Sequence, residues 1–334
     1  MTRLGLWMRV VLGALAFVCA SPPAAVSASQ KEAGQTVVIG MVVPNGQYPF
    51  FVEVRKGAEE AAAKLGARIT FQDSDGDPEG QVSVIQSFIS QKVDGILVSP
   101  ASADLLVPSI NDAAKTGIPV ATVGARANSG KVLVQVESDD AAGGRVAAQY
   151  IIEKLGNKGS VIELEGFSPS TAAAKRKAGF EKAIAGSSLK IISTNRFPTA
   201  FPPGSTGFDA QHSEGMDGIR PFGREVIATM IQEHQEFDAI FASNDLLIIG
   251  AVDALTAANV DPSSKVTVGF DANPDALQYI KDGKLSGTVG QSPAEQAARA
   301  VQYLVGYIRN KAIPPQKVVL ITPELVTKVP AGGT

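Results

Sequence analysis

Two stretches of this chain repeat one another about 144 residues apart. Residues 91–100 read QKVDGILVSP and residues 235–244 read QEFDAIFASN, with Gln, Asp, Ile and Ser at the same four places. A second repeat has nearly the same offset, because TVG at 122–124 returns at 267–269. Each copy has the pattern of a buried parallel strand that ends in a polar loop. The repeats therefore predict two similar α/β lobes along one chain.

Two such lobes are expected to turn their matching loops toward each other. Open α/β sheets bind small molecules beyond the carboxyl ends of their strands, and a cleft between two lobes is a natural ligand site. The alternative is that four matches in ten arise by chance among Val- and Ile-rich strands. The second repeat at almost the same offset argues against chance.

The rest of the chain alternates apolar strand patterns with amphipathic helix patterns. Strands are predicted at 37–43, 68–72, 95–99, 120–123, 160–164, 190–194, 239–242, 265–269 and 286–290. Helices are predicted at 50–65, 79–91, 104–116, 141–155, 171–185, 222–234, 246–258, 275–282 and 294–310. Short loops between alternating strands and helices favour parallel sheets covered by helices on both faces. The predicted fold class is therefore α/β.

The first 28 residues have the layout of a secretory signal peptide. Arg3 and Arg9 precede an apolar run at 10–20, and VSA at 26–28 predicts cleavage after Ala28. The run is too short to span a bilayer, which needs ~20 residues. An uncleaved anchor is the alternative.

Cysteine and charge narrow the range of functions. The single cysteine, Cys19, lies in the leader, where Val18 fits a lipoprotein cleavage box poorly. The mature chain then has no disulfide or thiol chemistry. The leader also carries two of the 30 basic residues and none of the 33 acidic ones, so the mature chain is more acidic than the formal charge of −3. That balance argues against a nucleic-acid partner.

A series of short motifs between residues 37 and 290 has a specific order. The motifs are PFF at 49–51, GA at 57–58, VIEL at 161–164, GF at 179–180, Phe241, ND at 244–245, VGFD at 268–271, PD at 274–275, DGKL at 282–285 and Gln291. In this order the chain resembles the ribose-binding protein group of type I periplasmic binding proteins. The resemblance implies two Rossmann-like lobes with parallel sheets, joined by three crossovers. Such proteins close on a sugar and deliver it to an ATP-driven importer.

The resemblance also implies where the lobes begin and end. The expected divisions are a signal peptide at 1–28, an N-terminal lobe at 35–138 plus 292–320, and a C-terminal lobe at 139–291 plus 321–334. Three crossings fit hinge closure, in which a few residues absorb the rotation of the backbone.

The aromatic side chains at residues 48–51 are candidates for one wall of the ligand site. In the group, rings at the positions of Phe50 and Phe51 stack on a sugar, whose C–H faces suit an aromatic platform. The alternative is that both rings belong to the core. Tyr48 stands where the group often has Asn, so its hydroxyl is expected to replace that hydrogen bond.

Polar candidates come from the second half of the chain. Asp271 follows a strand end and is expected to accept hydrogen bonds from two ligand hydroxyls, although it could be a turn residue. Gln291 lies at a crossover and can both donate and accept. Asn244 is expected to contact the ligand while Asp245 caps the next helix; both could be caps alone.

Three departures from the group concern its arginines and its third aromatic. The group places an Asp-Arg pair where this chain has Gly124 and Ala125, with Arg126 one place later. Arg126 lies at the same step of the repeat as Asp271, so we expect Arg126 to supply the missing guanidinium opposite that carboxylate. A further ligand arginine aligns with Ala174, and helical geometry is expected to turn its two basic neighbours, Lys175 and Arg176, to other faces.

The stretch at 202–221 looks like an insertion at the position where the group packs an aromatic on the ligand. It either supplies that ring, from Phe197, Phe201 or Phe208, or forms a free surface loop.

Other possible sites are set aside. The acidic residues 73, 75 and 77 mimic the start of a calcium loop, but Pro78 and Val84 replace its Gly and Glu, which favours an ordinary turn. No catalytic or metal-binding group of residues can be assembled from the sequence. We therefore expect that the protein is not an enzyme and that it has no cofactor and no metal. The loop at 165–171 opens a helix and could hold an anion, but Glu165 would repel it, which favours neutral ligands.

The resemblance therefore implies a periplasmic solute-binding receptor for a monosaccharide or related polyol. Its partners would be the sugar or polyol and the permease and ATPase of an ABC importer, with the receptor a monomer. One alternative is a sensing protein of the same fold that reports to a membrane receptor, and another is an exported sugar-active enzyme. The leader and the absence of a basic helix-turn-helix argue strongly against a sugar-responsive repressor.

Overall fold

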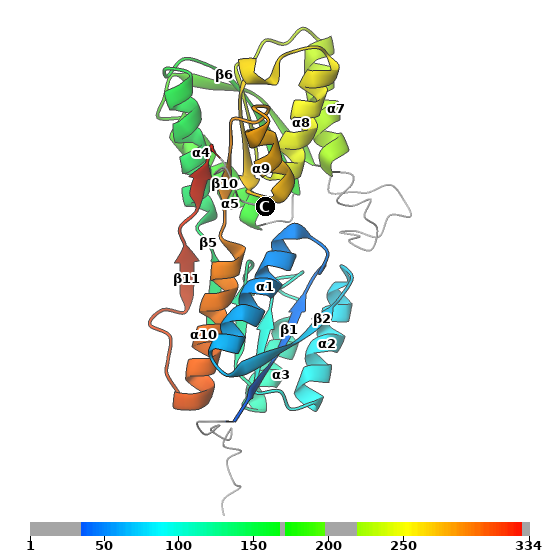
Figure 1. Cartoon of the computed structure of the whole chain (residues 1–334), viewed down its shortest axis with the longest axis vertical. Coiled ribbons are helices and arrows are strands. Elements are labelled where there is room, and N and C mark those ends of the chain that lie inside the picture. Colours follow the sequence, from blue (N-terminus) through cyan, green and yellow to red (C-terminus); the bar gives the residue numbers. More distant parts are fainter. Residues whose placement is uncertain (1–34, 168–170, 198–218, 329–334) are drawn as a thin grey trace, which may run out of the picture.

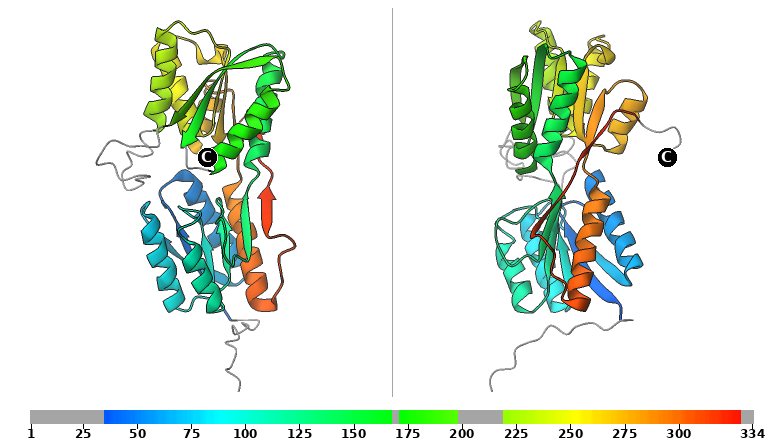
Figure 2. Two further views of the ribbon diagram at one scale, coloured as in Figure 1. Left: turned by 180° about the vertical axis from the view of Figure 1, so that it is seen from behind. Right: turned by 90° about the vertical axis from the view of Figure 1, so that its left-hand side faces the viewer.

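The computed structural model describes residues 35–167, 171–197 and 219–328. They form two α/β lobes, one above the other in Figure 1, and Figure 2 shows them from behind and from the side. The predicted leader, with Cys19 and the cut after Ala28, lies outside the described residues. No helix in the described part combines the length and apolar character needed to cross a membrane.

The lower lobe in Figure 1 contains a parallel sheet of six strands in the order β11-β5-β4-β3-β1-β2. The strands are β1 (Val37–Val43), β2 (Ala67–Asp73), β3 (Gly95–Val98), β4 (Val120–Val123), β5 (Val134–Ser138) and β11 (Val318–Ile321). The helices are α1 (Pro49–Lys64), α2 (Pro78–Ser90), α3 (Val107–Lys115) and α10 (Pro293–Asn310). Helices α1 and α10 cover one face and α2 and α3 the other, because alternate residues of β1 belong to two separate apolar clusters.

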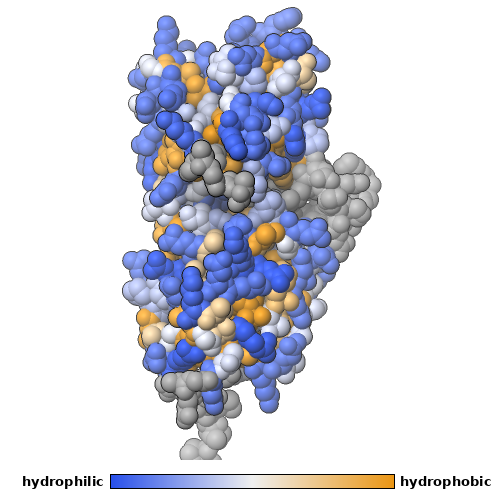
Figure 3. All heavy atoms as spheres, viewed as in Figure 1, coloured by the Kyte–Doolittle hydropathy of each residue, from blue (hydrophilic) through white to orange (hydrophobic). Residues whose placement is uncertain are grey.

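The upper lobe repeats this plan with the order β12-β10-β9-β8-β6-β7. The strands are β6 (Gly159–Phe167), β7 (Leu189–Phe197), β8 (Ala239–Ala242), β9 (Val266–Asp271), β10 (Gly287–Gly290) and β12 (Glu324–Val326), which alone in this sheet is antiparallel to its neighbour. The helices are α4 (Asp140–Lys154), α5 (Thr171–Ile184), α7 (Ile219–Gln232), α8 (Asp245–Ala257) and α9 (Pro274–Lys281), with a short 3-10 turn η1 (Pro262–Ser264). Again the apolar residues form one cluster on each face of the sheet. In Figure 3 mostly hydrophilic residues cover the visible face of both lobes.

The internal repeat corresponds to equivalent strands of the two sheets. The first pair of matching segments contains β3 and β8, which are fourth in their sheets. The second pair contains β4 and β9, which are third. The predicted α/β fold of two similar lobes is therefore confirmed.

The chain passes between the sheets after β5, after β10, and between β11 and β12. All strands except the last residue of β11 fall inside the predicted limits of the lobes. Those limits remain a prediction, because they also assign loops and termini. The right-hand view of Figure 2 shows the narrow connections between the lobes.

Strand β5 was not predicted. It carries Gln135 and Glu137 between valines, and all five of its residues are buried. Polar residues in a buried strand break the continuous apolar pattern by which the other strands of a parallel sheet are recognised. Gln135 is satisfied by accepting a hydrogen bond from the Ala127 amide at 2.9 Å.

Helices α4 and α5 cross at unusually short range. A Cβ on Gly144 would lie 2.0 Å from the carbonyl oxygen of Arg176, and one on Gly179 would lie 2.0 Å from that of Ala141. Only glycine fits at these two positions without moving a backbone. The crossing brings the first half of α5 against the start of α4, where Arg176 meets Asp140.

Candidate ligand-binding site

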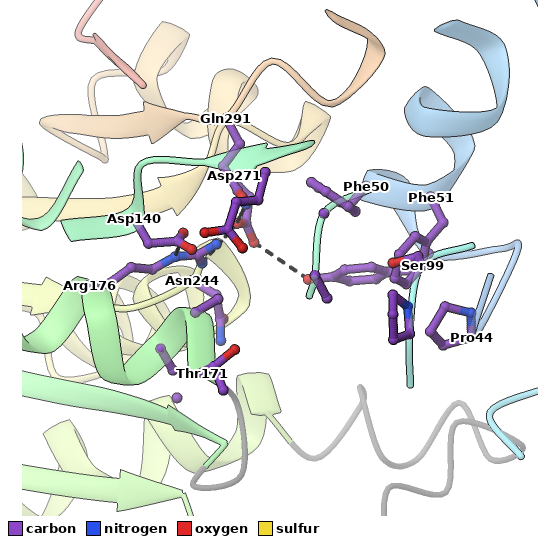
Figure 4. A pocket seen from close by; sticks show the side chains of 18 of the residues that line it. Pro44, Phe50, Phe51, Ser99, Asp140, Thr171, Arg176, Asn244, Asp271 and Gln291 are labelled. Atoms are coloured by element: carbon purple, nitrogen blue, oxygen red, sulfur yellow. Dashed lines mark hydrogen bonds and ion pairs between the residues drawn. The ribbon is translucent and has the colours of Figure 1, made fainter. Parts of the chain in front are cut away.

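A cleft of about 320 Å³ lies between the lobes. The seven residues expected from the sequence all line it: Tyr48, Phe50, Phe51, Arg126, Asn244, Asp271 and Gln291. Figure 4 shows the aromatic residues of the lower lobe on one side and the polar residues of the upper lobe on the other. The seven residues are brought together as expected, and their contact with a ligand stays a prediction.

The aromatic wall is built by the start of α1. Phe50 and Phe51 meet edge to face at 5.3 Å between ring centroids, and Tyr48 lies 5.9 Å from Phe51. Both phenylalanines also pack on the core beneath them, so the two alternatives weighed for them are compatible. Edge-to-face contacts hold these rings in place before any ligand arrives.

The position of Phe50 explains the missing carboxylate at Gly124. Gly124 has a φ of +75°, and a Cβ there would lie 2.8 Å from the Phe50 ring. A side chain at 124 would therefore compete with the aromatic wall for the same space.

Arg176, which was not predicted from the sequence, lies at the centre of the polar side. Its guanidinium donates to Asp140 at 2.9 Å, to Asp271 at 3.1 Å and to the Ser243 carbonyl at 2.8 Å. It also lies 3.8 Å over the Phe270 ring. The expectation that Lys175 and Arg176 turn to other faces was wrong, because both line the cleft. The close crossing of α4 and α5 directs this part of α5 inward, and no local pattern reports such a crossing.

Asp271 collects hydrogen bonds from both lobes. Besides Arg176, the Gln291 amide donates to its Oδ1, and the Tyr48 hydroxyl donates to its Oδ2 at 3.5 Å. Burial raises the pKa of Asp271 to about 6, against the opposing effect of Arg176 and Gln291. Its φ of 120°, with 55° at Ala272, places two non-glycine residues in a strained region at the end of β9.

Two neighbours of Asp271 have pKa values that are raised by their surroundings. Burial, and then the charge of Asp271, raises the pKa of Tyr48 well above its usual value. The same two causes raise the pKa of the buried Asp245 carboxyl well above its ordinary range. Tyr48 is thus a neutral donor that links the lobes.

Asn244 and Asp245 differ from the prediction in which of them caps α8. Asn244 caps α8, accepting a hydrogen bond from the Leu247 amide at 3.0 Å. Asp245 lies deeper and accepts from the Asn273 amide and the Thr288 hydroxyl. The prediction that Asp245 is the cap was therefore wrong. The Asn244 oxygen is used by the cap, which leaves its amide nitrogen for the cleft.

Arg126 is paired differently from our expectation. It lines the cleft, as Asp271 does, but its ion pair is with Glu137 of β5. Lys175 binds the same carboxylate at 2.8 Å. Glu137 and Asp140 were also not predicted from the sequence; the signal for Glu137 was a charged residue in a stretch of alternating valines.

Ile219, from the 202–221 stretch, lines the cleft. Phe201 and Phe208, and most of 202–221, lie outside the described residues, as does the side chain of Phe197. The 73–77 segment forms an ordinary turn, in which Asp77 caps α2. Within the described ranges, no group of three or more His, Cys, Asp or Glu residues is arranged to hold a metal ion.

Comparison with known proteins decides the family. The model of the periplasmic binding protein domain matches residues 39–312. The chain belongs to the periplasmic binding protein family. It is 34% identical over 272 residues to the ribose import binding protein of Bacillus subtilis, covering 81% of this chain and 82% of that one. The Escherichia coli ribose import binding protein is 31% identical, with 79% and 82% covered.

Solved periplasmic binding proteins share the fold. A solute-binding protein of Actinobacillus succinogenes with bound D-allose matches with a TM-score of 0.76 and 26% identity, covering 88% of this chain and 98% of that one. The Caulobacter myo-inositol binding protein matches with a TM-score of 0.73 and 25% identity, covering 90% and 96%. The family and these relatives are binding proteins and not enzymes.

Proposed function

We propose that this protein is a periplasmic receptor that binds a monosaccharide or related polyol and delivers it to the permease and ATPase of an ABC importer. The observation that carries the proposal is the cleft between the lobes, with an aromatic wall on one side and the polar residues around Asp271 on the other. The relatives are named for ribose import and for binding of allose and myo-inositol.

The two sides of the cleft suit different parts of a sugar. The C–H face stacks on Phe50 or Phe51, while hydroxyls donate to Asp271 and bond with Gln291 and Asn244. Arg176 keeps the Asp271 carboxylate oriented, which lowers the ordering cost of binding.

Binding favours the closed arrangement because the ligand touches both lobes only when they are together. A ligand shifts this equilibrium by its difference in affinity for the two states. Gln291 and Ser292 lie where the chain returns to the first lobe, and Ser292 has a φ of 52°. We assign this connection to the hinge.

The leader supports export to the periplasm, with cleavage after Ala28. The resemblance to the binding-protein group supports action there as a monomer. The lobes are taken as residues 35–138 plus 292–320 and 139–291 plus 321–334. Cleavage is tested by the mass of the protein recovered from the periplasm.

Thermal unfolding of the chain from Ser29 tests the function. The panel contains pentoses, hexoses, polyols, nucleosides and amino acids. A ligand at ~100 times its Kd adds ~2.7 kcal/mol to the free energy of unfolding. We expect stabilisation by a sugar or polyol, lost in Asp271→Ala and kept in Asp112→Ala, which removes an exposed carboxylate of α3. Stabilisation by a nucleoside or amino acid alone would overturn the substrate class.

A further inference from the structure

Two cations of the cleft share a single carboxylate. The Arg126 guanidinium and the Lys175 ammonium both contact Oε1 of Glu137, the latter at 2.8 Å. Glu137 is buried, while the side chains of Arg126 and Lys175 are 35% and 36% exposed. All three line the cleft. This trio, which we term the Glu137 cluster, has a formal charge of +1.

The Glu137 cluster also has more donors than acceptors. A guanidinium carries five N–H donors and an ammonium three. The Nε of Arg126 is buried and without a hydrogen-bond partner among the described residues. Because that nitrogen is buried, the donors within reach of a ligand are those on the exposed parts of Arg126 and Lys175.

The neighbouring cluster around Arg176 has the opposite balance. Arg176 is only 9% exposed and lies between two carboxylates, Asp140 and Asp271. These carboxylates balance the positive charge of Arg176, and their oxygens can accept hydrogen bonds from ligand hydroxyls. The cleft thus offers acceptors at one cluster and positively charged donors at the next.

Glu165, which was expected to repel an anion, does not line the cleft, and its carboxylate lies 2.8 Å from the Lys177 ammonium. Thr171, at the start of α5, does line the cleft (Figure 4). The positive end of this helix adds to the favourable potential for an anion.

We propose that the natural ligand is an acidic sugar, an aldonate or uronate, whose carboxylate binds Arg126 and Lys175 while its hydroxyls bind Asp271 and Gln291. The inference rests on the proposed function and names the substrate class within it. A single excess positive charge matches a carboxylate monoanion better than a phosphate dianion. Charge-assisted hydrogen bonds to a carboxylate supply the selectivity against the neutral sugar.

Calorimetric titration at pH 7.5 with matched ligands tests the proposal. The pairs are glucose with glucuronate and gluconate, galactose with galacturonate, and ribose with ribonate. For the pair that binds, the acid is expected to have a Kd at least about tenfold below that of its neutral parent, from charge-assisted hydrogen bonds. This preference should shrink as salt screens the charges.

Variants assign the preference to the Glu137 cluster. Lys175→Gln should reduce, by about tenfold, the ratio of the Kd of the neutral sugar to the Kd of its acid. Lys175→Arg, which keeps the positive charge, should leave most of this ratio intact. Glu137→Gln should increase the ratio, because it removes the competing carboxylate. The matched control is Lys182→Gln, an exposed lysine of the same helix outside the cleft lining. An unchanged ratio in Lys175→Gln would overturn the proposal.

The outcomes separate this inference from the proposed function. Binding of neutral sugars as tightly as their acids, or tighter, defeats the inference and keeps the sugar receptor. Tighter binding of sugar phosphates than of either also defeats it, because the Glu137 cluster would then serve a phosphoryl group. Absence of binding by every sugar, acid and polyol defeats both.

Discussion

Asp271 is held by side chains from three separate parts of the chain, and its geometry is costly. It is largely buried, its backbone is strained, and its pKa is raised on folding to about 6. For such a group, stability is present below the unfolded pKa of ~3.9 and is lost as pH rises through about 6. Near neutral pH the protein therefore retains an ionised acceptor at the expense of stability.

Ligand affinity should depend on this ionisation. The charged carboxylate accepts two hydroxyls, whereas the protonated form gives up acceptor capacity, so affinity should fall as pH drops below about 6. For a neutral sugar the fall approaches about tenfold per pH unit. Titrations from pH 8 to pH 5 would measure it, with Asp271→Asn as a weaker-binding control whose affinity does not titrate. A flat profile in the unmodified chain would contradict the assignment.

Gly124 illustrates a departure from family expectation that has a steric cause. Gly124→Asp should destabilise the protein by about 1–3 kcal/mol, from a strained φ and from overlap with Phe50. Gly283→Asp is the matched control, since Gly283 has a φ of +71° but no atom within 4 Å of its built Cβ. Urea unfolding of both variants separates the two causes. Equal losses would mean that Phe50 does not resist the side chain.

At the level of elements, much of the architecture could be predicted from the sequence. Apolar periodicity located most strands, and proline at the first helical position marks the starts of α1, α2, α9 and α10. Strand β5 was missed because its polar residues find partners only in the folded protein. Asp271 could be expected in the cleft, since strand ends converge there, whereas Arg176 depends on a helix crossing that is set by tertiary packing.

The close crossing of α4 and α5 can be tested by substitution. Gly179→Ala should cost about 1–3 kcal/mol of stability, because a methyl group would meet the backbone of α4. It should also weaken ligand binding, by moving Arg176 from Asp140. Gly186→Ala, whose built Cβ is 3.4 Å from the nearest atom, is the control. Denaturation and ligand titration of both variants test this. Full affinity in Gly179→Ala would show that the crossing does not position Arg176.

At the scale of the whole molecule, Tyr48 joins the lobes through Asp271. Tyr48→Phe keeps the ring and removes this bond, so the unliganded protein should spend more time open and bind more weakly. Small-angle X-ray scattering would report a larger radius of gyration without ligand. Tyr303→Phe on α10, which packs on the lower core away from the cleft, should leave the scattering unchanged. Identical scattering for Tyr48→Phe and the unmodified chain would contradict the prediction.

The late return of the chain to its first lobe affects the order of synthesis and folding. One face of the lower sheet is covered by residues of α10, such as Val301 and Leu304, and the edge strands β11 and β12 come later still. A ribosome that has made the first 138 residues has produced a sheet with one face covered by α1 but not yet by α10. The nascent chain therefore cannot complete either lobe until β11 and β12 have been made. It then stays unfolded for longer than a chain of two consecutive domains would. That delay suits a polypeptide that must thread through a membrane before it folds.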